Sequence, residues 1–286
     1  MHASAAIREL RSAAIAAADL LLPRECVVCN RAMDRDENAM VCGRCWARLP
    51  LLPAPRCDRC GHPLRDLKPR AHSQSNHQSL HETSFRSTPT GTLLELDDAV
   101  RCKWCELLPP YVRSARSVAW AAGPIGLGIV HAIKYGGWHR VGDEIASRMA
   151  RLDFPADVID ERRALVPVPL STKRLRERGY NQSELLARAL GRRWNLSVWH
   201  EVLTRVRHTE TQTRLTPGDR LRNVSGAFSA PDSAKKMLRG AHVIVVDDVV
   251  TTAATLNACA AALCAGGARI VSFVTFGRAP ALGDRW

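Results

Sequence analysis

The chain has 286 residues and a formal net charge of +13, from 41 Lys and Arg against 28 Asp and Glu. Its hydrophobic content of 46% supports a packed core, either one large domain or a core domain with a smaller module. The basic balance favours a polyanionic partner over a membrane surface or a basic substrate. The absence of any run of 18 apolar residues argues against a membrane span.

We expect residues 1–25 to form an N-terminal helix that packs on the body of the protein. The segment Ser12–Leu22 is apolar enough to suggest a signal peptide, but Asp19 interrupts it and no small-residue cleavage site follows. An amphipathic helix is therefore the better interpretation, and we expect a cytoplasmic protein.

Eight of the ten cysteines form four Cys-x-x-Cys pairs, namely Cys26 with Cys29, Cys42 with Cys45, Cys57 with Cys60, and Cys102 with Cys105. Two such pairs can complete a tetrahedral shell for structural Zn²⁺. Twelve residues separate the first two pairs, which is typical of a zinc ribbon, whereas 41 separate the last two. That longer gap contains a polar segment, which we interpret as a loop inserted at 68–92. We expect a double zinc ribbon over 26–110 with one or two Zn²⁺ ions.

The ligand set leaves alternatives open. The four pairs can combine in an interleaved order, and a histidine can replace one cysteine, the candidates being His62, His72, His77 and His81. A disulfide framework is disfavoured because no secretory signal is evident. The remaining cysteines, Cys259 and Cys264, are expected to be small core residues.

Hydrophobic patterns predict an α/β domain over 115–286. Its predicted strands are Ser117–Ala122, Ala164–Val168, Val224–Phe228, Val243–Val246 and Arg269–Phe276. Its predicted helices are Ile125–Tyr135, Trp138–Leu152, Ser183–Trp194 and Thr255–Ala265. The polar stretch Arg205–Asn223 has no apolar period and is expected to be a functional lid.

A basic cluster follows the strand at 164–168. Four cations fall within six residues, Lys173, Arg174, Arg176 and Arg178, and Gly179 ends the helical pattern. Cations beside a strand end suit a pyrophosphate, and Asn181 and Gln182 can bond to an oxygen-rich ligand. The alternative interpretation is a solvated basic helix start.

The segment His242–Thr255 carries the strongest chemical signal. A β-branched strand leads into Asp247 and Asp248, then into three threonines around two alanines at the start of a helix. The carboxylates can accept hydrogen bonds from ribose hydroxyls, while the hydroxyls and the free N–H groups of the helix start can hold a phosphate. The pattern predicts a sugar-phosphate site. The alternative is an ordinary strand–turn–helix in which Asp248 is a turn or cap acid.

This segment resembles the phosphoribosyl pyrophosphate (PRPP) motif of type I phosphoribosyltransferases. The resemblance implies PRPP-binding residues Asp247, Asp248, Val249, Val250, Thr251, Thr252, Ala253, Ala254 and Thr255. That family usually has Gly at the position of Ala253. If the residue there must take a positive φ, Ala costs about 1 kcal/mol or more relative to Gly, whereas Ala at an ordinary helix start is harmless.

The segments from Val166 to Leu190, from Arg205 to Phe228 and from Val243 to Thr252, placed after Cys-x-x-Cys ribbons, resemble the ComF family. The resemblance implies an α/β fold, a type I phosphoribosyltransferase-like parallel sheet flanked by helices and preceded by a small zinc-ribbon module. It also implies a link to DNA uptake in competence or to the use of DNA as a nutrient.

Three functional hypotheses follow. The leading one is a protein that binds PRPP or a related phosphoribosyl ligand together with Mg²⁺. The candidate residues for the pyrophosphate are Lys134, Arg174 and Arg178. The candidate partners are competence or DNA-processing proteins. The second is an active phosphoribosyltransferase of the nucleotide-salvage type, although no catalytic residue is evident. The third is a zinc-ribbon module that binds single-stranded DNA and keeps a vestigial sugar-phosphate site, which the lack of an aromatic ladder weakens.

Overall fold

The structure is a computed structural model, and it describes residues 24–33, 39–64, 102–135, 139–207, 226–281 and 284. Residues 1–23 of the helix predicted at 1–25, the loop predicted at 68–92 and the part of the lid after residue 207 lie outside these residues. Arg24 and Glu25 are described and are not helical, because Glu25 forms an isolated β-bridge with Ala32. His72, His77 and His81 also lie outside them. Among the described residues, no helix is long and apolar enough to cross a membrane.

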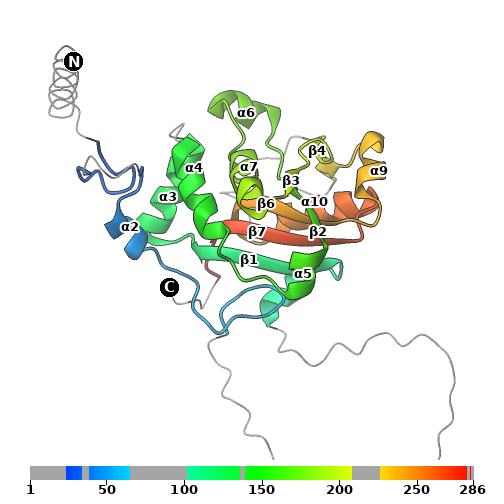
Figure 1. The fold of residues 1–286 in the computed structure, drawn as a ribbon, viewed down its shortest axis with the longest axis horizontal. Coiled ribbons are helices and arrows are strands. Elements are labelled where there is room, and N and C mark those ends of the chain that lie inside the picture. The colour runs from blue at the N-terminus through cyan, green and yellow to red at the C-terminus, as the bar shows by residue number, and fades with distance from the viewer. Residues whose placement is uncertain are drawn as a thin grey trace, which may run out of the picture.

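A sheet of five parallel strands forms the centre of the molecule, in the order β1-β7-β6-β2-β3 (Figure 1). The strands are β1 (Val112–Trp120), β2 (Arg162–Pro167), β3 (Ser197–Val198), β6 (His242–Val250) and β7 (Ile270–Arg278). The β-branched run that predicted β6 is buried, as expected for a strand covered on both faces. The strand is longer than predicted, because it continues through both acids to Val250.

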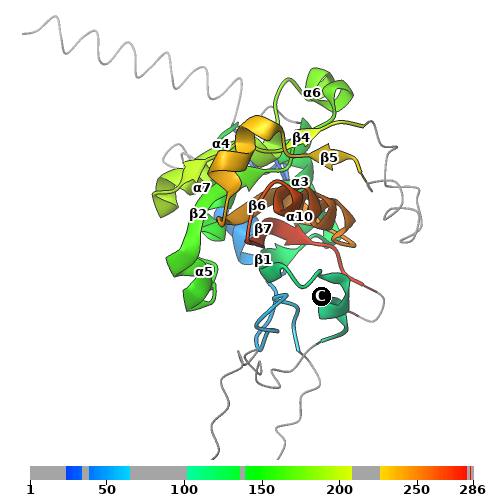
Figure 2. The same ribbon diagram turned by 90° about the vertical axis from the view of Figure 1, so that its right-hand side faces the viewer.

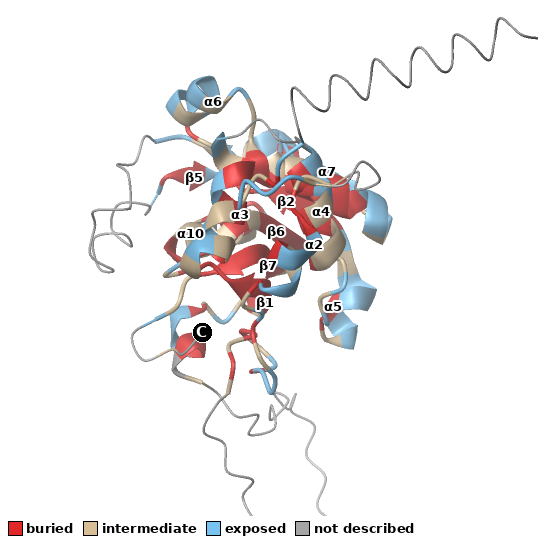
Figure 3. Cartoon of the chain, turned by 90° about the vertical axis from the view of Figure 1, so that its left-hand side faces the viewer, coloured by how far each residue is buried: buried red, intermediate tan, exposed pale blue. Residues whose placement is uncertain are grey.

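Helices cover both faces of the sheet, so the α/β architecture is confirmed (Figure 2). On one face, α3 (Gly123–Tyr135), α4 (His139–Met149) and α7 (Gln182–Trp194) share a core with Ile244 and Val246. On the other face, α10 (Ala254–Ala265) shares a core with Val243 and Val245. Alternate side chains of β6 therefore belong to two different cores, one on each face of the sheet. The buried strands lie between the helical layers (Figure 3).

Shorter elements complete the described chain: α5 (Ala156–Glu161), α6 (Thr172–Arg178), η3 (Asp232–Ala234), α9 (Lys235–Leu238) and an antiparallel pair, β4 (Thr204–Arg205) with β5 (Phe228–Ser229). The predicted helices are confirmed to within three residues at each end. Two strand predictions were less accurate. β1 begins at Val112, ahead of the predicted Ser117, and β5 contains only the last residue of the strand predicted at 224–228.

The first ribbon is attached to α4. In its short helix α2 (Gly43–Ala47), Trp46 donates a hydrogen bond of 3.0 Å from Nε1 to Oε2 of Glu144. The other oxygen of Glu144 accepts from the backbone N–H of Met40 at 2.6 Å. The Arg148 guanidinium lies 3.3 Å from the centroid of the Trp46 ring. Trp46 therefore joins the ribbon to the domain.

The second ribbon, with η1 (Lys103–Leu107), is attached through two arginines. Arg59 donates to the carbonyl oxygens of Val112, Leu108 and Pro109. The buried Arg278, at the end of β7, donates to the carbonyl of Cys60 and stacks over Trp104 at 4.4 Å. These two guanidinium groups hold the ribbon on the sheet, and their hydrogen bonds go to carbonyl oxygens of the protein itself.

Candidate functional site

The eight paired cysteines converge into two clusters of four, one of Cys26, Cys29, Cys42 and Cys45 and one of Cys57, Cys60, Cys102 and Cys105. Within each cluster the sulfur atoms all lie within 4.8 Å of one another. A tetrahedral Zn–S shell with bonds of about 2.3 Å has S···S edges of about 3.8 Å. Edges of 3.8 and 3.9 Å in the first cluster match this shell, and the second cluster, with edges of 3.1, 3.3 and 3.9 Å, is more compact. The donor set therefore fits Zn²⁺, and it consists of sequential pairs.

In both ribbons, the residue after the second cysteine of the leading pair takes a positive φ. These residues are Asn30, at φ 55°, and Gly61, at φ 66°. A Cβ on Gly61 would lie 2.6 Å from the carbonyl oxygen of Ala115, so only Gly fits there. Gly43, between the cysteines of the second pair, is the first residue of α2 and does not take a positive φ. His62 belongs to neither cluster of four cysteines, and its Nε2 lies 3.2 Å from Oδ1 of Asp284.

The acid pair lies near the C-terminal end of β6, where three side chains from two helices meet it. Lys134, in the last turn of α3, places its Nζ 2.7 Å from Oδ2 of the buried Asp248. Gln182, the first residue of α7, donates from Nε2 to the other oxygen of Asp248 at 3.3 Å. Ser183 donates from its hydroxyl to Oδ1 of Asp247 at 2.7 Å. The sheet edge thus holds two adjacent carboxylates in a network that spans both neighbouring helices.

The two carboxylates have opposite protonation tendencies. Burial and the neighbouring Asp248 carboxylate raise the pKa of Asp247 to about 8. Burial by itself would also raise the pKa of Asp248, but the Lys134 ammonium and hydrogen bonds to the carboxylate lower it instead. At neutral pH the pair therefore carries about one negative charge, which Lys134 balances.

The loop after the acid pair leads into a helix start that has no side-chain cap. Ala253 occupies the N-cap position of α10 with φ 59° and ψ 2°, a left-handed conformation, and no side chain caps the helix. The buried Oγ1 of Thr252 has no hydrogen-bond partner among the described residues. An unpartnered buried hydroxyl beside free helix N–H groups suits an anion. The sequence did not decide whether Ala253 takes a positive φ or an ordinary helical φ. In the structure its φ is positive.

The basic cluster forms α6, with Gly179 ending the helix at φ 78°. This helix extends beyond the sheet at the end where α7 begins (Figures 1 and 2). Arg178 donates to Oε1 of Gln182 at 2.8 Å and lies 4.9 Å from the ring centroid of Tyr135. Through Gln182 it is linked to the acid pair. Arg174 is half-buried in the first turn of α6, and in the described part of the chain it bonds to neither acid.

Several residues near the site were not predicted from the sequence. Ser183 and Tyr135 are two of them. Arg205, the first residue of the predicted lid, lies in β4, and no contact with the acid pair was predicted for it. Burial, then the Arg174 charge, lowers the pKa of Arg205, while the Asp247 charge acts on it in the opposite direction. Arg205 therefore belongs to the same electrostatic neighbourhood. The helix-start position of Ser183, directly after Asn181 and Gln182, was the available signal in the sequence.

Comparison with known proteins agrees with this geometry. The phosphoribosyl transferase domain family matches residues 182–286, and the double zinc ribbon domain family matches residues 17–77. The "DNA utilization protein YhgH" of Escherichia coli O157:H7 is 35% identical over 179 residues, which cover 59% of this chain and 74% of that protein. The chain belongs to the ComF family. Its ribbon match ends before Cys102 and Cys105, which complete the second cluster.

Two further relatives of this ComF-family chain are named for competence. "Competence protein F" of Haemophilus influenzae is 43% identical over 94 residues, or 33% of this chain and 41% of that protein. "Competence protein ComFC" of Bacillus subtilis is 37% identical over 98 residues, or 34% of this chain and 37% of that protein.

Zinc content should follow the two cysteine clusters. We expect two Zn²⁺ per chain by elemental analysis, one for each cluster. Cys29→Ser and Cys60→Ser should each reduce the content to one, because they act on separate shells, and Cys259→Ser should leave it unchanged. If either variant loses both ions while the chain stays folded by circular dichroism, the two shells are not independent.

The raised pKa of Asp247 should make stability depend on pH. The folded chain keeps a proton that the unfolded chain releases, so this group lowers stability progressively as the pH rises from about 4 to about 8. Asp247→Asn removes that dependence, and its stability advantage over wild type in urea unfolding should be larger at pH 8 than at pH 5. The exposed Asp143→Asn is the control. An advantage that does not grow with pH would contradict the assignment.

The left-handed conformation of Ala253 should be visible in stability. Ala253→Gly relieves a cost of about 1 kcal/mol, less the burial of one methyl group, so the free energy of unfolding should stay level or rise. Ala254→Gly, one residue into α10, should lower it by about 0.5–1 kcal/mol. Urea unfolding of the two variants measures the contrast. Equal losses in both would show that position 253 carries no strain.

Proposed function

We propose that this ComF-family chain binds PRPP, or a closely related phosphoribosyl ligand, together with Mg²⁺. The observation that carries the proposal is the acid pair at the end of β6, which leads directly into the uncapped start of α10. Sugar hydroxyls need acceptors and a phosphate needs donors, and this segment offers both within nine residues of chain, 247–255. The match of residues 182–286 to the phosphoribosyl transferase domain supports the same assignment.

Each part of the ligand has suitable groups. Asp247 and Asp248 would accept from the ribose hydroxyls, and the loop 251–255 would hold the 5′-phosphate through hydroxyl and backbone N–H groups. The Oγ1 of Thr252 is the group whose hydrogen bonding such a phosphate would complete. Lys134, Arg174 and Arg178 are the cations proposed for the pyrophosphate. Arg205 is a further candidate because its charge acts on Asp247.

The proposal assigns Mg²⁺ to the acid pair, because carboxylate and phosphate oxygens are the ligands that this ion prefers. When bound, Mg²⁺ would neutralise charge on the pyrophosphate. The ligand-free pair is already balanced by Lys134 and by protonation of Asp247. Loading the site would then release Lys134 towards the pyrophosphate and a proton from Asp247.

The names of the relatives suggest the cellular context. We propose that the chain acts in the uptake or use of DNA in the cytoplasm, with competence or DNA-processing proteins as partners. The support is similarity to proteins named for DNA utilization and for competence. Single-stranded DNA stays a candidate ligand, although Arg59, a cation of the second ribbon, bonds to carbonyl oxygens of the protein itself.

Transfer of the ribosyl group is a second candidate function. The cations around the acid pair would stabilise a departing pyrophosphate. We assign no residue as an acceptor-activating base. Pyrophosphate release from PRPP in the presence of a panel of purine and pyrimidine bases separates transfer from binding alone.

The binding proposal is tested by thermal unfolding with PRPP and Mg²⁺. At 100 times Kd a ligand stabilises the folded state by about 2.7 kcal/mol, or about 5–10 °C for a domain of this size. We expect this shift in wild type and in Asp143→Asn, an exposed acid away from the site, and its loss in Asp247→Asn and Asp248→Asn. No shift in wild type at millimolar PRPP would refute the proposal.

A further inference from the structure

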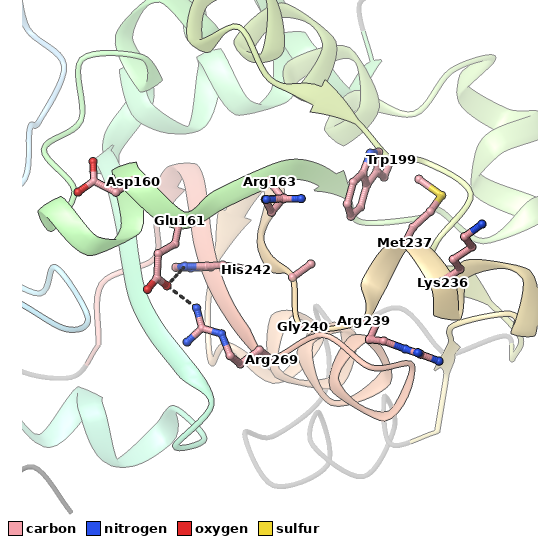
Figure 4. A pocket seen from close by; sticks show the side chains of 11 residues that line it. Asp160, Glu161, Arg163, Trp199, Lys236, Met237, Arg239, Gly240, His242 and Arg269 are labelled. Carbon is pink, nitrogen blue, oxygen red and sulfur yellow. Dashed lines mark hydrogen bonds and ion pairs between the residues drawn. The ribbon is translucent and has the colours of Figure 1, made fainter.

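A cavity of about 640 Å³ lies at the opposite edge of the sheet from the acid pair (Figure 4). Its floor is formed where β2 and β6 begin, and its walls come from the end of α5, the residue after β3, and α9 with the turn that follows. We call it the α9 cavity. Its volume falls in the range of about 300–1,000 Å³ that is usual for small-molecule sites.

The lining of the α9 cavity is cationic. Arg163, Lys236, Arg239 and Arg269 line it, against two carboxylates, those of Asp160 and Glu161. Glu161 is already engaged, at 2.5 Å by Arg269 and at 3.5 Å by the buried His242. Figure 4 shows this cluster at one end of the cavity, with Asp160 beyond it.

The other end of the cavity therefore keeps an excess of positive charge. Within the described chain, Arg163, Lys236 and Arg239 make no ion pair with a carboxylate, and all three are exposed. Burial lowers the pKa of His242, so this ring adds no charge at neutral pH. Unpaired guanidinium and ammonium groups around one hollow favour a phosphate group.

An apolar wall stands beside these cations. Trp199 is half-buried, and its backbone N–H donates to the carbonyl of Leu165 at 2.9 Å, which holds it against the edge of the sheet. Met237 lies beside it and is 46% exposed (Figure 4). A Cβ on Gly240, in the turn after α9, would meet no atom within 4 Å, so no other group fills the space at this wall.

We propose that the α9 cavity binds a nucleotide, with the base against Trp199 and Met237 and the phosphate on Arg163, Lys236 and Arg239. Trp199 packs against the core with part of its surface, and a phosphate alone would contact only the cations, whereas a nucleotide would also cover the exposed part of the apolar wall. The same unit can come from a free nucleotide or from a single-stranded DNA. The cavity is lined by one tryptophan, while strand binding generally uses successive aromatic platforms, so the free nucleotide is favoured.

Titration of the zinc-loaded full chain with dAMP tests this proposal by calorimetry. We expect dAMP to bind at least tenfold more tightly than adenosine or inorganic phosphate. Lys236→Ala combined with Arg239→Ala should weaken dAMP binding at least tenfold, because both cations are exposed and their removal leaves the fold intact. The matched control is Arg188→Ala combined with Arg192→Ala, two exposed arginines of α7, which should leave the affinity unchanged.

Two further measurements locate the ligand. In Trp199→Phe, dAMP should still bind but should quench less of the tryptophan fluorescence. Asp247→Asn should retain dAMP binding, which separates the α9 cavity from the proposed PRPP site whether or not PRPP binds.

Three results would overturn the proposal. One is dAMP binding that the Lys236 and Arg239 changes do not affect. Another is dAMP binding lost in Asp247→Asn, which would place the nucleotide in the phosphate loop. The third is binding of a dT20 strand ten times tighter than dAMP with the same dependence on Lys236 and Arg239, which would assign the cavity to a strand.

Discussion

Two adjacent carboxylates at the covered end of a buried strand are the constraint around which this domain is organised. Neighbouring charges in a low-dielectric site repel each other and lose their hydration, so the pair is stable only if it is compensated. The chain compensates Asp248 with Lys134 and Gln182, and Asp247 with a hydroxyl from Ser183 and a retained proton. Removal of one partner would leave a buried charge unpaired, so these contacts matter together.

This compensation fixes how the helices meet the sheet. Lys134 reaches Asp248 because α3 ends at the same sheet edge, and Gln182 and Ser183 reach the pair because α7 begins there. Arg178 then extends the network by bonding to Gln182 and stacking on Tyr135. Groups that converge for electrostatic balance in the free protein are also those that a sugar pyrophosphate would engage. The site is therefore preorganised by the same interactions that permit its burial.

Much of this arrangement could be predicted from local pattern. The β-branched run, the acid pair and the hydroxyl-rich helix start are contiguous, so β6 and α10 were predictable, and so were the Cys-x-x-Cys knuckles. The pairing of Lys134 with Asp248 was not, because 114 positions separate them and only the fold brings them together. The φ of Ala253 could not be predicted for another reason. Ala can take either a positive φ or an ordinary helical φ, and the geometry of the turn decides between the two. Likewise, spacing alone left the cysteine pairing open.

The contacts of the arginines also change how the net charge of +13 is interpreted. Arg59 and Arg278 satisfy carbonyl oxygens at the base of the second ribbon, and Arg148 stacks on Trp46 at the base of the first. Each ribbon also shares a hydrophobic core with the domain, and planar guanidinium groups add to this burial because they can bond to several carbonyl groups at once. Part of the basicity is thus structural, and it is no evidence for nucleic acid. The cations proposed for ligand binding lie elsewhere, near the acid pair and α6 at one edge of the sheet and around α9 at the other.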